Sequence, residues 1–151
     1  METRTAVQFS VFLVNKPGVL AQVTRALGGA KVNILAMTLV DSQEHGVLRM
    51  VIEDPAAARK VLTNLNLPMT EAEVLVLDLS NRPGALGDVA TTLGESHVNI
   101  NYAYCTGGAP GGRTTGIFKV ADVKKAQQVL KGVGEKSKAR DEGVRGRPAR
   151  R

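Results

Sequence analysis

Apolar residues recur along the chain at two spacings, and each spacing predicts one kind of element. Every second residue of Val7–Leu13 is apolar, which predicts a strand with one buried face over residues 7–14. Leu20, Val23 and Leu27 follow at helical spacing and predict an amphipathic helix. The next stretches predict two strands, a second helix and a final strand; they are residues 32–40, 47–52, 54–64 and 69–73.

Turn and cap residues separate these stretches. Asn15-Lys16-Pro17-Gly18 is typical of a turn that also opens a helix. Gly28 stands where the C-terminal glycine of that helix is expected. Asp54 followed by Pro55 predicts an N-cap with proline at the first helical position. The predicted order is therefore β-α-β-β-α-β.

The pattern occurs a second time, 66 residues further along the chain. Ten of the twenty positions from 15 to 34 are identical to their counterparts, namely Asn15, Pro17, Gly18, Leu20, Val23, Leu27, Gly28, Val32, Asn33 and Ile34. Four further identities follow at an offset of 68, where Asp54, Ala58, Val61 and Leu62 match Asp122, Ala126, Val129 and Leu130. The second copy therefore predicts strands at 74–79, 98–104 and 114–120, a helix with the stripe Leu86, Val89 and Leu93 that ends at Gly94, and a helix from Asp122 to Gly132.

The order β-α-β-β-α-β predicts an α+β, ferredoxin-like fold, with an antiparallel sheet and both helices on one face. We expect one module at residues 1–72, a second at 73–133 and a tail at 134–151. The second module has no clear fourth strand, because only Val133 is apolar between Gly132 and the tail. Its sheet is completed by a neighbouring strand or stays open, and an open edge favours a homodimer joined through the sheets.

Composition narrows the functional classes. The chain has 151 residues with 43% hydrophobic, 23% charged and 3% aromatic residues, which is typical of a soluble domain. One cysteine, Cys105, excludes an internal disulfide and a cysteine-based zinc site. It is expected to be half-buried and unreactive. We expect a cytoplasmic protein with no cofactor, no metal, no membrane contact and no catalytic constellation. The glycine-rich segment 107–113 is interpreted as a hairpin turn, because no helix follows it to cradle a phosphate.

The net charge of +6 gathers at the C-terminus. Residues 134–151 hold seven Lys or Arg and three Asp or Glu, so they carry 7 − 3 = +4. This segment has too few apolar residues to offset its ordering entropy and is predicted to be disordered. Arg145-Gly146-Arg147-Pro148 is similar to the core of an AT-hook, which binds the DNA minor groove. We favour a solubilising or nonspecific anion-binding tail over a nucleic-acid partner.

The repeated loop is the candidate binding site. Gly18, Val19 and Leu20 follow Pro17 and present the free N–H groups of a helix N-terminus, which favour a carboxylate. The Asn15 side chain is expected either to cap Gly18 or to accept a ligand amine. A purely structural interpretation stays open, in which asparagine caps, proline starts the helix and glycine turns the chain.

With the strand that precedes it and Val-Asn-Ile opening the next strand, this loop resembles the ACT domain, and both copies carry it. The resemblance covers about residues 6–132 and implies a tandem, stand-alone, non-catalytic regulatory protein that binds an amino acid where two domains pair. The implied ligand-binding residues are Asn15, Pro17, Gly18, Val19, Leu20, Asn33 and Ile34 in the first copy, with Asn81, Pro83, Gly84, Ala85, Leu86, Asn99 and Ile100 in the second.

The chain departs from the family at the first loop residue, where asparagine replaces the frequent aspartate in both copies and removes a charge that pairs with a ligand amine. A second interpretation is the small regulatory subunit of acetolactate synthase, which has similar length and an N-terminal ACT domain. The second half of that subunit does not usually repeat the Pro-Gly loop, whereas residues 81–86 do. A third interpretation is a nucleic-acid-associated regulator that uses the basic tail.

Overall fold

The structure, a computed structural model, describes residues 1–41, 45–108 and 112–133. Its elements are β1 (Thr3–Val14), α1 (Val19–Gly29), β2 (Ile34–Val40), β3 (His45–Ile52), α2 (Pro55–Asn64), β4 (Met69–Ser80), α3 (Ala85–Glu95), β5 (Ile100–Cys105), β6 (Arg113–Val120) and α4 (Val123–Leu130). The chain forms two compact units. Of the described residues, the N-terminal unit holds Thr5–Val74 with Tyr104–Thr106, and the C-terminal unit holds Met1–Arg4, Leu75–Ala103 and those from Gly107 to Val133.

The strands are hydrogen-bonded in the order β2-β3-β1-β4-β6-β5. In the N-terminal unit β3 runs antiparallel to both β1 and β2, with Phe12 opposite Val47 and Met37 opposite Met50. In the C-terminal unit β4 runs antiparallel to β6, with Leu77 opposite Gly116. The predicted fold class is confirmed, because the chain is α+β and repeats a ferredoxin-like module.

The core of the N-terminal unit lies between one sheet face and the first two helices. Phe9 and Val11 of β1 are fully buried there, as the alternation along this strand predicts. Val23 and Leu27 of α1 pack against the same cluster, together with Leu62 of α2. Asp54 caps α2 as predicted, because its carboxylate accepts a hydrogen bond from the Ala57 N–H at 3.1 Å.

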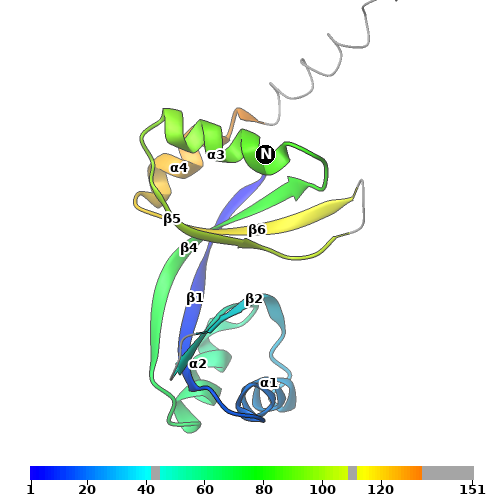
Figure 1. The fold of residues 1–151 in the computed structure, drawn as a ribbon, viewed down its shortest axis with the longest axis vertical. Helices are drawn as coiled ribbons and strands as arrows, with labels where there is room; N and C mark the ends of the chain where they lie inside the picture. The colour runs from blue at the N-terminus through cyan, green and yellow to red at the C-terminus, as the bar shows by residue number, and fades with distance from the viewer. Residues whose placement is uncertain (42–44, 109–111, 134–151) are drawn as a thin grey trace, which may run out of the picture. The chain divides into compact units, whose positions relative to one another are not determined.

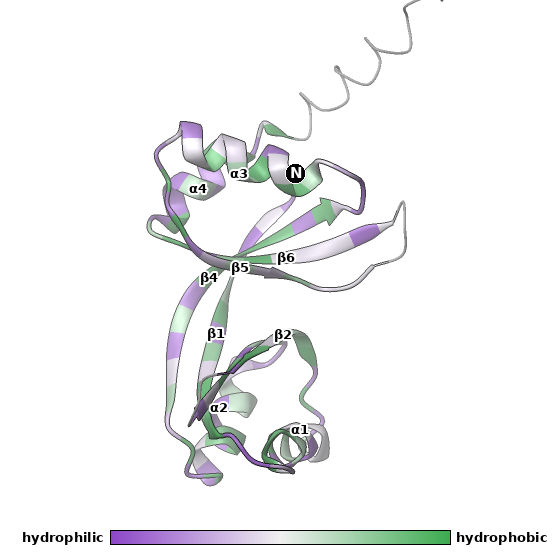
Figure 2. Cartoon of the chain, viewed as in Figure 1, coloured by the Kyte–Doolittle hydropathy of each residue, from purple (hydrophilic) through white to green (hydrophobic). Residues whose placement is uncertain are grey.

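The core of the C-terminal unit repeats this arrangement. Both α3 and α4 lie on one face of its strands (Figure 1), and both carry hydrophobic as well as hydrophilic residues (Figure 2). Val89 and Leu93 of α3 are fully buried against Leu77 of β4 and Phe118 of β6. Asp122 caps α4 as predicted by accepting from the Lys125 N–H at 2.9 Å, although this helix ends at Leu130 rather than at Gly132.

The C-terminal unit obtains its fourth strand from the start of the chain. The Asp78 N–H in β4 donates to the Glu2 carbonyl oxygen at 3.2 Å, and Met1 packs against the core of this unit. β4 is itself one continuous strand, where the sequence predicted two strands in succession. The neighbouring strand that the sequence left open is therefore β1.

The ends of α1 and α3 differ from the prediction. Gly28 and Gly94 lie within the last turn of each helix, and neither has a positive φ. The left-handed residues are Lys31 and His97, with φ of 58° and 55°. Three further residues after each glycine let the chain turn before Val32 or Val98 enters the core, so the glycines do not terminate these helices.

Three segments fall outside the described residues: 42–44, 109–111 and 134–151. The predicted disorder of the tail and its AT-hook-like sequence lie there. Over the described ranges, no helix is long and apolar enough to cross a membrane.

Candidate functional site: the two Pro-Gly loops

The first loop places Gly18 at the N-terminus of α1. The Lys16 N–H turns back to the Val14 carbonyl oxygen at 2.9 Å. Gly18 then adopts φ 88° and ψ −13°, and its carbonyl oxygen accepts the Gln22 N–H at 3.0 Å. The helix begins at Val19, directly after the glycine, as predicted. This left-handed conformation is unfavourable for a residue with a Cβ atom, which explains why glycine occupies the position.

The Asn15 side chain does not cap Gly18, so this part of the prediction is wrong. Its Nδ2 group donates instead to Asp41 Oδ1 at 3.1 Å, at the end of β2. The asparagine therefore connects the loop to the end of β2. Gly18 turns the chain into α1 without a side-chain cap. The Asn15 amide oxygen keeps no partner among the residues described and can still accept a ligand amine.

The second loop has the same backbone path. Gly84 adopts φ 85° and ψ −15°, and the Asp88 N–H donates to its carbonyl oxygen at 2.9 Å. Asn81 again contacts the following hairpin, since its Nδ2 group donates to the Gly108 carbonyl oxygen at 2.9 Å and its N–H to that of Gly112 at 2.8 Å. The duplicated sequence thus builds two equivalent loops.

The two loops differ in the charged residues around them. Arg82 Nη2 and Asp88 Oδ2 form an ion pair at 2.9 Å, and Arg82 Nη1 also donates to the Pro83 carbonyl oxygen at 3.1 Å. This pair places a carboxylate in the first turn of α3, where the helix dipole already attracts negative charge. The first turn of α1 holds no acidic residue. The α1 N-terminus is therefore the better receptor for a ligand carboxylate.

The first loop also has more free space around its glycine than the second loop has. A Cβ atom built on Gly18 meets no other atom within 4 Å, whereas one built on Gly84 lies 3.8 Å from Arg82 Nη1. Pro17 and Gly18 are exposed. The first loop is open to a ligand, and the second is partly covered by its own arginine.

The predicted residues of the next strands flank these helix starts. Ile34 packs against the core cluster that Val19 and Leu20 also contact, and Ile100 packs against the core of the C-terminal unit. Asn33 and Asn99 have exposed side chains and precede β2 and β5. The carbonyl oxygens of these two asparagines accept N–H groups from Glu53 and Ala121, each at 3.1 Å. The asparagines are therefore held by their backbone, and their side chains are available at the surface.

Leu86 departs from the helical stripe that the sequence assigned to it. Its exposed fraction is 50%, whereas Ala85 is buried with 9% exposed. The helix therefore turns Ala85 towards the interior, although the repeat aligns Leu86 with the half-buried Leu20. Leu86 contributes an apolar surface at the start of α3 rather than a core contact.

Sequence reasoning missed Asp41, Asp88 and Arg82 as determinants of the loops. Asp41 lies 26 positions from Asn15, so no local spacing pointed to the contact. Arg82 and Asp88 lie six positions apart across the turn into a helix, and no periodic pattern connects such residues. The difference between Asp88 and its counterpart Gln22 was the available signal.

Other chemistry is limited in the part of the chain that the structure covers. Cys105 is exposed rather than half-buried, and desolvation raises the pKa of its thiol. The neutral thiol is a poor nucleophile near pH 7. Among the described residues, no three His, Cys, Asp or Glu side chains are grouped to hold a metal ion.

Comparison with known proteins agrees with this architecture. The sequence profile of a family described as an ACT domain pair matches residues 4–136. Protein BT0572 from Bacteroides thetaiotaomicron is similar to the chain with 29% identity and a TM-score of 0.78, over 85% of this chain and 88% of that one. The ligand-free regulatory subunit of aspartate kinase from Thermus thermophilus shares the fold, with 12% identity and a TM-score of 0.67, over 89% and 96% of the chains. No match was found among curated proteins.

Proposed function

Because the chain belongs to the ACT domain pair family, we propose that it is a non-catalytic regulatory protein that binds an amino acid at its Pro-Gly loops. Binding reports the level of that amino acid to a partner enzyme or transporter. The proposal makes the protein a cytoplasmic sensor without a cofactor. Its ligand-binding residues are the loop and strand-start residues that the resemblance to the ACT domain implies.

The geometry at Gly18 is the observation that carries this proposal. The left-handed glycine turns the chain so that α1 begins at once, and beyond Gly18 and its two chain neighbours no atom lies within 4 Å of the position of a Cβ atom. A carboxylate approaching there meets the N–H groups and the positive end of the helix dipole. The amide oxygen of Asn15 suits the ammonium group of the same ligand.

The first loop is proposed as the stronger site. α1 has no acidic residue in its first turn, whereas α3 holds Asp88 there. A ligand carboxylate at α3 would have to displace or share the Arg82 guanidinium, which is already engaged with Asp88 at 2.9 Å. We therefore expect two sites of unequal affinity rather than two equal ones.

The structural neighbours support an enzyme of amino-acid biosynthesis as the partner. The similar chain from Thermus thermophilus is a regulatory subunit of aspartate kinase, and the likeness to it covers 89% of this chain. This comparison favours a separate regulatory chain that works with a catalytic one. A regulatory subunit of acetolactate synthase remains the alternative, and copurification with a large thiamine-dependent subunit would distinguish it.

We further propose a homodimer, formed through the exposed edge of the N-terminal unit. β2 is an edge strand, and its side chains Met37, Leu39 and Val40 expose 39%, 46% and 47% of their surface. An unpaired apolar edge favours association with a second copy. Sedimentation should give a dimer for the wild type and a shift towards monomer for Leu39→Lys. A wild type that sediments as a monomer at every concentration would contradict the dimer.

A thermal-shift screen against the twenty common amino acids tests the binding proposal. A ligand that binds only the folded state at about 100 times its Kd adds about 2.7 kcal/mol to the free energy of unfolding. We expect one amino acid, or one chemical group of them, to raise the melting temperature in a concentration-dependent way. The absence of any shift with all twenty would contradict the proposal.

A further inference from the structure

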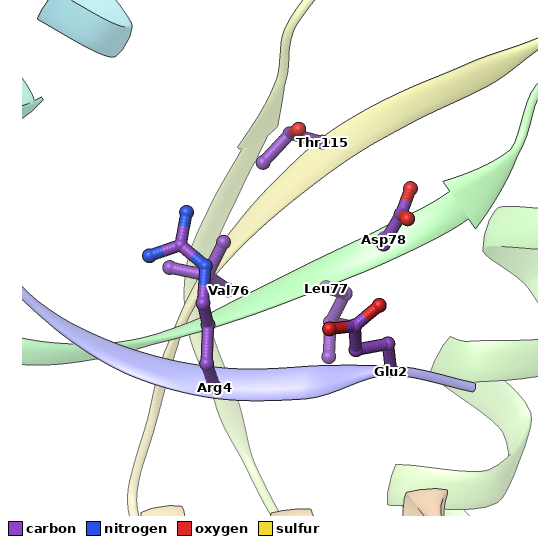
Figure 3. A pocket seen from close by; sticks show the side chains of 6 residues that line it. All are labelled: Glu2, Arg4, Val76, Leu77, Asp78 and Thr115. Carbon is purple, nitrogen blue, oxygen red and sulfur yellow. The ribbon is translucent and has the colours of Figure 1, made fainter. Parts of the chain in front are cut away.

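A hollow lies in the C-terminal unit and is lined by residues that belong to neither Pro-Gly loop. It is lined by Glu2, Arg4, Val76, Leu77, Asp78 and Thr115 and has a volume of about 200 Å³. Figure 3 shows the side chains of Glu2 and Arg4 rising from the start of the chain over β4, with Asp78 and Thr115 beyond them. Leu77 packs into the core on the other face of β4, so it borders the hollow through its backbone. The site is built on three strands, β1, β4 and β6.

The strands fix where the charged groups stand. The Asp78 N–H donates to the Glu2 carbonyl oxygen at 3.2 Å, which holds the start of β1 against β4. Arg4 lies in β1 and Glu2 directly precedes that strand. Figure 3 shows both side chains on the same side of the chain, and two residues of extended chain separate their Cα atoms by about 6.4–6.8 Å. One positive and one negative head group are therefore held side by side, with Val76 as an apolar floor.

The hydrogen-bonding capacity of these groups is incompletely used. Asp78 Oδ2 accepts from Arg113 Nε at 2.6 Å, and Arg113 Nη2 donates to the Asp78 carbonyl oxygen at 3.0 Å. Within the described ranges, Asp78 Oδ1 has no partner, and the side chains of Glu2 and Arg4 form no hydrogen bond or ion pair. Arg113 offsets the charge of Asp78, so Glu2 and Arg4 leave the hollow with one unpaired charge of each sign.

We infer that this hollow binds a small zwitterion that carries a carboxylate and a primary ammonium group, the chemistry of an α-amino acid. The Arg4 guanidinium binds the carboxylate through paired N–H donors. The Glu2 carboxylate and Asp78 Oδ1 accept from the ammonium group, and Val76 contacts the carbon skeleton. The inference does not depend on the function proposed for the Pro-Gly loops, because none of the lining residues belongs to a loop.

The size of the hollow sets an upper limit on the ligand. Pockets for drug-sized ligands enclose about 300–1,000 Å³, and this hollow encloses about 200 Å³. A nucleotide or a coenzyme exceeds that space. The mixed charge also disfavours a simple anion or a simple cation, because each would pair with only one of Glu2 and Arg4 and would meet the like charge of the other.

The test uses the full chain labelled with 15N and carrying any purification tag at the C-terminus. L-alanine is the probe, with acetate and methylammonium as compounds that each hold one of its charges. We expect saturable shifts of the backbone amides of Arg4, Asp78 and Thr115 with L-alanine, and about tenfold weaker binding of acetate and of methylammonium. Arg4→Gln and Glu2→Gln should each weaken L-alanine binding about tenfold. Arg25→Gln, which changes an exposed arginine outside the hollow, should leave it unchanged.

The outcomes separate this site from the loops. Shifts confined to Val19 and Leu20 would overturn the inference and leave the proposed function standing, because they report the first loop alone. Acetate binding as tightly as L-alanine, with no effect of Glu2→Gln, would overturn the zwitterion class. L-alanine shifts at the hollow that survive Arg4→Gln in a chain with a wild-type circular dichroism spectrum would overturn the assigned role of Arg4.

Discussion

Replacing Gly18 by alanine tests the loop geometry without touching any other side chain. Gly18 has φ 88°, a region in which an L-amino acid places its Cβ atom close to its own backbone. The added methyl group meets no other atom within 4 Å. Any loss of stability in Gly18→Ala must therefore come from backbone strain and not from a clash with a neighbour.

The expected magnitude follows from the conformation. A non-glycine residue in the left-handed region costs about 1–2 kcal/mol. Gly28 in the last turn of α1 is the matched control, since a Cβ atom there also meets nothing within 4 Å and its φ is not positive. Gly28→Ala should stabilise the protein by about 0.4–1 kcal/mol, because alanine restricts the unfolded chain.

Urea unfolding followed by circular dichroism measures both variants against the wild type. We expect the free energy of unfolding to fall for Gly18→Ala and to rise for Gly28→Ala. If Gly18→Ala were as stable as Gly28→Ala, the residue at position 18 would not be left-handed in solution. The helix start and the open space above it would then be wrongly placed.

Three further predictions concern the rest of the fold. Asp88→Asn should lower stability by about 0.3–1 kcal/mol, because it removes a negative charge from the α3 N-terminus; an unchanged urea midpoint would contradict this. A hydrogen bond from Arg59 lowers the pKa of Glu71 in the folded protein. The ion pair between Arg59 and Glu71 therefore stabilises the fold fully above the pKa that Glu71 has in the unfolded chain, and this stabilisation is lost as pH falls through its folded-state pKa. Glu71→Gln should flatten the acidic limb of the stability profile, and equal slopes in urea titrations across that range would argue against the pair. Gly116→Ala should cost about 1–3 kcal/mol, because its Cβ atom would lie 2.8 Å from Phe118 Cε2; a wild-type melting temperature would refute that packing.

Local patterns predicted most of the fold because each copy follows simple periodicities. The alternation around Phe9 and the spacing of Val23 and Leu27 located core positions that are fully buried. Asp54 and Asp122 marked the starts of two helices through a cap that acts over three residues. Such signals depend only on residues that are near one another in sequence, so these elements could be predicted without the structure.

Long-range contacts account for what the sequence did not predict. The fourth strand of the C-terminal unit comes from Glu2 and its neighbours, 76 positions before Asp78, and no periodicity connects the two. The exposure of Leu86 depends on how α3 rotates against its sheet, which the aligned repeat with Leu20 misassigned. The Asn15–Asp41 contact likewise requires a folded hairpin. The assignment of the loops as ligand sites remains a prediction.

Isothermal titration calorimetry with the amino acid found in the thermal-shift screen tests the central claim most directly. The titrations compare the wild type with Gly18→Leu, Gly84→Leu and the double variant, each checked for folding by circular dichroism. A leucine side chain at either position would fill the space above the helix N-terminus. We predict that Gly18→Leu removes the stronger binding event, that Gly84→Leu removes any weaker one, and that the folded double variant binds only at sites outside the loops. Unchanged affinity and stoichiometry in the folded double variant would contradict the account.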